Sequence, residues 1–138
     1  MLNSLVKSKF NFLIYIPGLI YSILIAYLLL IPSENISDFW LFKLPYFDKT
    51  AHFLIFAFLY LIWFITFLIS RANNKKGIYH KALAITVACI LYSIILETFQ
   101  YFISYRNFDV YDIAANVTGT IFATFLSYKR GAPLKSMP

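Results

Sequence analysis

Three groups of polar residues interrupt the apolar segments of this 138-residue chain. The groups are Asp48, Lys49 and His52; Glu97 and Gln100; and Arg106, Asp109, Asp112 and Asn116. Spacings of three and four residues place side chains on one face of a helix. Carboxylates and an imidazole can act as general acid and base or bind a divalent cation, while Arg and Lys suit phosphate groups. The candidate catalytic residues are Glu97, His52 and Asp112.

Four apolar segments would have to position these groups, at about residues 10–31, 48–70, 82–104 and 112–128. Each is about as long as a helix that crosses a hydrocarbon core of ~30 Å. The chain is 61% hydrophobic and 13% charged, whereas a soluble domain has roughly 25% charged residues. We therefore predict a single all-α membrane domain over residues 1–138, built as a bundle of four transmembrane helices. Pro17 and Gly18 would allow a kink in the first helix.

Lysine and arginine residues are distributed unequally beside these segments. One side of the membrane would carry nine of them, and the other would carry Lys43, Lys49 and Arg106. Since cytoplasmic loops are enriched in Lys and Arg, we expect both termini on the cytoplasmic side of an inner membrane, with membrane lipids as partners. The basic residues are divided among short segments, which argues against a nucleic-acid partner.

This topology places all six acidic residues at the outer face or at the outer ends of helices. We predict an extracytoplasmic polar pocket formed by Asp48, Lys49, His52, Glu97, Gln100, Arg106, Asp109, Asp112 and Asn116. Simpler roles stay open for some members. Asp48 and Asp112 would also suit helix N-caps, His52 a packing position, and Arg106 a salt bridge that fixes its loop.

Small residues continue the face of the last helix that carries Asp112 and Asn116. Gly119 and Ala123 follow at helical spacing, and small side chains let helices approach closely in lipid. We expect these two positions to serve helix packing. The same positions leave a homo-oligomer open.

With these motifs assembled, the sequence resembles the VanZ-like family of small bacterial membrane proteins. The resemblance covers residues 48–123 and rests on three motifs: Asp48-Lys49-x-x-His52, Glu97-x-x-Gln100 and Arg106-x-x-Asp109-x-x-Asp112-x-x-x-Asn116-x-x-Gly119. Ala123 stands where the family often has a second glycine. The resemblance implies a link to resistance against the glycopeptide antibiotic teicoplanin, because the family takes its name from such a member. It implies no settled enzymatic activity.

Three functions fit these features. The favoured one is binding of a lipid-linked envelope precursor or a lipidated glycopeptide in the polar pocket. The alternatives are an outer-leaflet enzyme that uses acid-base chemistry or Mg²⁺ or Ca²⁺, and a structural membrane scaffold. We expect no cofactor and no zinc site, because His52 is the single histidine near the cluster. We expect no helix to carry polar residues along its full width, which argues against a transporter or channel.

Overall fold

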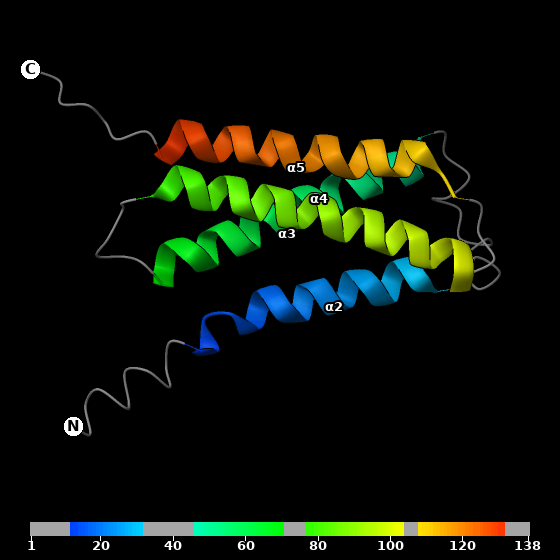
Figure 1. The fold of residues 1–138 in the computed structure, drawn as a ribbon, viewed down its shortest axis with the longest axis horizontal. Helices are drawn as coiled ribbons and strands as arrows, with labels where there is room; N and C mark the ends of the chain where they lie inside the picture. The colour runs from blue at the N-terminus through cyan, green and yellow to red at the C-terminus, as the bar shows by residue number, and fades with distance from the viewer. Residues whose placement is uncertain (1–11, 32–45, 71–76, 104–107, 132–138) are drawn as a thin grey trace, which may run out of the picture.

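The computed structural model of the chain describes residues 12–31, 46–70, 77–103 and 108–131. Within these ranges the chain forms four long α-helices, α2 (Ile16–Leu30), α3 (Phe47–Ser70), α4 (Ile78–Ile103) and α5 (Val110–Gly131) (Figure 1). The predicted all-α architecture is confirmed.

Two helices begin at positions that differ from the sequence prediction. Regular helix α2 begins at Ile16, so Pro17 lies in its first turn and not at an interior kink. Proline is tolerated there because the first amides of a helix have no partner within the helix. Helix α4 begins at Ile78, directly after Gly77, whose φ of +74° is a left-handed conformation that glycine adopts without steric cost.

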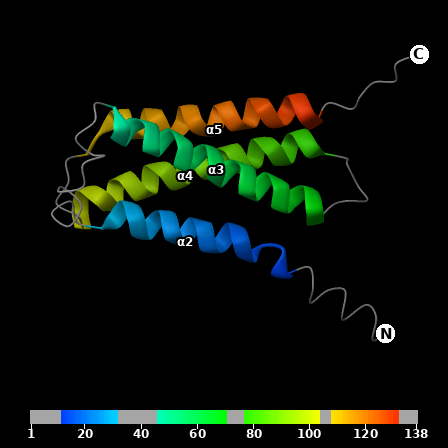
Figure 2. The same ribbon diagram turned by 180° about the vertical axis from the view of Figure 1, so that it is seen from behind.

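The helices lie alongside one another, with α2 and α5 on opposite flanks and α3 and α4 between them (Figures 1 and 2). The most extensive interface joins α3 to α5, and α2 packs on α3 and α4. Helices α3 and α5 begin at the end of the bundle where α2 and α4 finish, which we call the Asp48 end. The opposite end, where α4 begins, is called the Lys81 end.

Gly119 allows α3 and α5 to pack with their backbones in contact. A Cβ atom at this position would lie 2.1 Å from the carbonyl oxygen of Phe53. Ala123, one turn further along α5, is also buried. This face of α5 has no room for a larger side chain at Gly119.

The distribution of side chains is unusual for a protein in water. Large apolar residues on every helix are more than half exposed: Ile23, Phe58, Phe102 and Phe125 are examples. Polar residues, in contrast, are buried between the helices: His52, Thr66, Thr86, Ser93, Glu97, Gln100, Asp112, Asn116, Thr120 and Ser127. In the described ranges, two helical stretches, Phe47–Ser70 and Ile78–Phe102, are long and apolar enough to cross a membrane, and α2 is apolar but shorter.

Candidate functional site

Lys49 is the centre of the polar cluster at the Asp48 end. It lies in the first turn of α3, and its ammonium donates hydrogen bonds to Asp109 Oδ2 at 2.5 Å and to Asp112. Asp48 Oδ2 lies 3.4 Å from the same nitrogen. One cation therefore holds together three carboxylates from α3 and from the start of α5.

Asp109 has a second role as the residue that caps α5. Its carboxylate accepts the backbone N–H of Tyr111 at 2.8 Å, and its backbone oxygen accepts the N–H of Asp112 at 3.1 Å. These contacts are typical of an N-cap. The hydrogen bond from Lys49 holds the pKa of the Asp109 carboxyl below its usual range. The suggestion that Asp112 caps this helix is wrong, because Asp109 fills that position.

A chain of buried hydrogen bonds runs inward from this cluster across three helices. His52 Nδ1 on α3 lies 3.0 Å from Asn116 Oδ1 on α5, and Asn116 Nδ2 donates to Ser93 Oγ on α4 at 2.8 Å. All three side chains are buried. They tie α3, α4 and α5 together at one level of the bundle.

This chain also fixes the orientation of the His52 ring. An amide oxygen can only accept, so the bond to Asn116 places a proton on His52 Nδ1. The other nitrogen, Nε2, faces two carboxylates, with Asp48 Oδ1 at 3.8 Å and Asp112 Oδ2 at 3.9 Å. Candidate ligand atoms from Asp48, His52 and Asp112 all lie within 4.8 Å of one another.

Glu97 and Gln100 occupy the last part of α4 and are both buried. Gln100 Nε2 donates a 2.7 Å hydrogen bond to the carbonyl of Leu29, near the end of α2. The last four carbonyls of a helix have no partner within it, so this bond satisfies one of them and joins α4 to α2. Gln100 therefore anchors α2 as well as belonging to the predicted polar set.

The structure brings most of the predicted site residues to one end of the bundle but buries more than half of them. The side chains of Asp48, Lys49 and Asp109 are exposed by 37%, 32% and 35%. The buried members are His52, Glu97, Gln100, Asp112 and Asn116. The accessible part of this polar cluster thus consists of two carboxylates around one ammonium, and the buried polar side chains lie beneath it. Arg106 lies outside the described residues.

A polar stripe on α5 was missed in the sequence. Asp112, Asn116, Thr120 and Thr124 follow at four-residue intervals, and the three that precede Thr124 are buried. The threonine hydroxyls donate to carbonyls one turn earlier, and Thr124 Oγ1 also lies 2.8 Å from Thr86 Oγ1 of α4. The expectation that no helix carries polar residues along its full width is wrong for α5. The constant four-residue spacing of these polar residues is the signal in the sequence that could have revealed the stripe.

The VanZ/LLP1 family model matches residues 12–130, a range that extends beyond the motif region. A protein described as "Uncharacterized protein C11E3.10" from Schizosaccharomyces pombe is 34% identical over 83 residues, which are 60% of this chain and 48% of that protein. The chain thus spans about half the length of this curated relative. No solved structure shows significant similarity to the chain.

Proposed function

The chain belongs to the VanZ/LLP1 family, and from this premise we propose that it is a four-span membrane protein whose Asp48 end binds the polar head of a lipid-linked ligand. Both termini would lie on the cytoplasmic side of an inner membrane, with the polar cluster at the outer face. The ligand would be a lipid-linked envelope precursor or a lipidated glycopeptide. A role in teicoplanin resistance would follow from the second ligand.

Membrane insertion is supported by the inverted distribution of side chains. Exposed apolar residues on all four helices would face water at a cost of about 25 cal/mol for each Å² left exposed. The same surface is compatible with lipid, where packing of small residues and buried hydrogen bonds hold helices together. The Gly119 contact and the bonds through Asn116 are of these kinds.

The orientation is supported by the position of charges in the bundle. The described acidic residues, Asp48, Glu97, Asp109 and Asp112, belong to the Asp48 end. Lys81 and Lys129 belong to the opposite end. A cytoplasmic Lys81 end would agree with the enrichment of basic residues in cytoplasmic segments.

The observation that carries ligand binding is the partly exposed arrangement around Lys49. Its ammonium suits a phosphate oxygen, and the accessible carboxylates of Asp48 and Asp109 suit amine or hydroxyl groups. The buried layer beneath them, with His52 fixed by Asn116, keeps the three groups in place. A lipid-borne phosphate or sugar would meet such groups at the membrane interface.

The occurrence of a similar protein in a yeast favours one of the two ligand classes. A lipid carrying a phosphate or a sugar is a ligand that a bacterium and a yeast could share. A lipidated glycopeptide antibiotic acts on a bacterial cell wall, which a yeast does not have. The lipid-linked compound is therefore the preferred ligand.

Binding should be measured on the purified protein in nanodiscs with a fluorescent polyprenyl-phosphate-linked sugar and, separately, with teicoplanin. Asp109→Asn and Lys49→Gln each remove one charged contact, worth about 1.5–3 kcal/mol, which corresponds to roughly ten- to a hundredfold weaker binding. Lys129→Gln is the matched control because it removes a charge at the Lys81 end. Equal affinities for the parent protein, both cluster variants and Glu97→Ala would refute the proposal.

A divalent cation at Asp48, His52 and Asp112 is the second candidate. The Nδ1–H bond to Asn116 would leave the lone pair of Nε2 on a neutral His52 available as a metal ligand beside both carboxylates, as in metal sites whose histidines are oriented by a hydrogen bond. A bound Mg²⁺ or Ca²⁺ would allow hydrolysis or transfer on a lipid-linked phosphate. Titration with Mn²⁺ followed by electron paramagnetic resonance tests this idea. Identical spectra for the parent protein and the His52→Leu variant would exclude the site.

A purely structural cluster predicts a different outcome. Replacing Asp112 by Asn would then lower the amount of protein in the membrane, and variants that remain abundant would keep every phenotype. Abundance and ligand affinity should therefore be measured on the same variants.

A further inference from the structure

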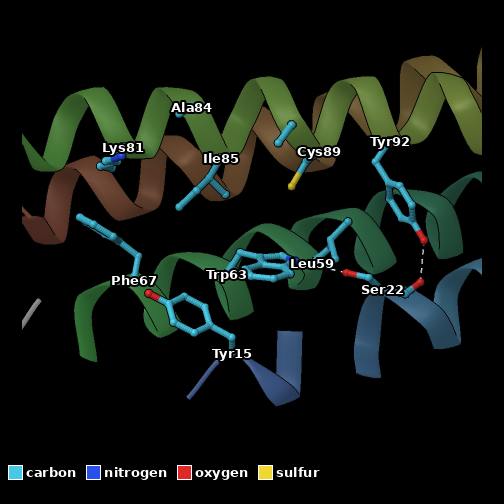
Figure 3. A pocket seen from close by; sticks show the side chains of 11 residues that line it. Tyr15, Ser22, Leu59, Trp63, Phe67, Lys81, Ala84, Ile85, Cys89 and Tyr92 are labelled. Carbon is cyan, nitrogen blue, oxygen red and sulfur yellow. Dashed lines mark hydrogen bonds between the residues drawn. The ribbon is translucent and has the colours of Figure 1, made fainter. Parts of the chain in front are cut away.

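A cavity of about 510 Å³ lies between α2, α3 and α4, in a part of the bundle that excludes the polar cluster. Its volume falls within the roughly 300–1,000 Å³ typical of small-molecule sites. Trp63 and Phe67 of α3 face Ile85 and Cys89 of α4 across it, and Tyr15 lines the side toward α2 (Figure 3). The lining is almost entirely apolar.

One end of this cavity is closed by contacts that hold α2 to its neighbours. Tyr92 donates a 2.6 Å hydrogen bond to the carbonyl of Ser22, and Trp63 Nε1 donates to Ser22 Oγ at 3.2 Å. Gly18 lies directly against the Trp63 ring, which a Cβ atom there would approach to 3.0 Å. These contacts hold α2 against α3 and α4 at this end of the cavity.

The other end of the cavity carries a positive charge. Lys81 lies there with Phe67, and it belongs to the first turn of α4, which contains no acidic residue (Figure 3). The start of a helix also carries a partial positive charge. An apolar chamber with a cation at one end is complementary to an amphiphile with an anionic head and an apolar tail.

We propose that this cavity binds an acyl chain of an anionic phospholipid whose phosphate pairs with Lys81. The lipid would belong to the membrane leaflet opposite the polar cluster. This site takes from the proposed function only that the helices lie in a bilayer, and its failure would leave ligand binding at the Asp48 end unaffected.

The test uses Trp63 as a reporter inside the cavity. The chain has two tryptophans, so Trp40→Phe leaves Trp63 as the single one. Its fluorescence is measured in vesicles that contain phosphatidylglycerol or phosphatidylcholine with brominated acyl chains, which quench tryptophan on contact. A lysine near the membrane surface contributes about 1 kcal/mol to binding of an anionic lipid, so brominated phosphatidylglycerol should be preferred about fivefold.

Three further variants locate the preference. Lys81→Gln should bring the ratio of the two affinities close to one, whereas Lys129→Gln, a surface charge at the same end that lies over Phe125, should leave it unchanged. Ala88→Phe fills the cavity from an exposed position and should reduce quenching by both lipids.

Two results would overturn the site. Equal losses of preference in the Lys81 and Lys129 variants would mean that diffuse surface charge attracts the lipid. Weak quenching by both lipids in the parent protein would mean that another part of the chain, or a second copy, fills the cavity.

Discussion

Replacing Gly119 by alanine should damage the bundle more than any other addition of one methyl group to its described glycines. The new Cβ would lie 2.1 Å from the carbonyl oxygen of Phe53 and 2.9 Å from its carbonyl carbon. These atoms are backbone, so no side-chain rotation relieves the overlap. Restoring ordinary contact, which begins at 3.4 Å, requires α3 and α5 to separate by more than about 1 Å.

The size of the effect follows from this separation. Overpacking costs about 1–3 kcal/mol through displaced side chains and backbone shifts, and the upper end applies where two helix backbones must move. His52 immediately precedes Phe53 in the sequence, and Asn116 lies one turn before Gly119. A shift of about 1 Å would stretch their 3.0 Å hydrogen bond beyond hydrogen-bonding range. We therefore expect a loss of about 3 kcal/mol in the free energy of unfolding, together with weaker ligand binding.

Unfolding in mixed detergent micelles, followed by circular dichroism, measures the loss. Gly18→Ala is the matched control, because its Cβ would meet the side chain of Trp63 at 3.0 Å and the ring can move by a few tenths of an ångström. Its cost should be about 1 kcal/mol. Equal costs for the two variants, or a Gly119→Ala protein within about 0.5 kcal/mol of the parent, would refute the backbone-contact argument.

Three further predictions concern the polar cluster. In a double-mutant cycle of Lys49→Met and Asp112→Asn, the free energies of unfolding should show a coupling of at least about 1 kcal/mol, and additive effects would mean that the ion pair contributes nothing. The pKa of Asp109 is lowered in the folded protein, so its stabilising contribution is present above the unfolded-state pKa and is lost as the pH falls through the folded-state pKa. The free energy of unfolding measured below about pH 4 should show this loss in the parent protein, and its dependence on pH should be flatter in Asp109→Asn. Asn116→Leu breaks two buried hydrogen bonds and should cost about 2 kcal/mol in unfolding measurements, whereas Ser93→Ala breaks one and should cost about 1 kcal/mol.

The sequence alone was sufficient for the class of fold and for the family. Long apolar segments predict helices because backbone groups away from water must be paired within their own segment. The VanZ-like motifs identified the family, which the match over residues 12–130 confirms. The placement of Asp48, His52 and Asp112 near one another also followed from antiparallel helices joined by short connections, since such helices bring alternate ends together.

The tertiary structure decided which of these groups contact one another. Lys49 pairs with two residues 60 and 63 positions away, and no local pattern encodes such a distance. Asp109 caps α5 because the helix begins at Val110. Asp112 therefore lies inside the first turn, where its side chain faces Lys49 and His52. The cavity beside Trp63 likewise depends on how α2 packs against two other helices. Helical spacing is a property of a few neighbouring residues, whereas contacts between helices depend on the packing of the whole bundle.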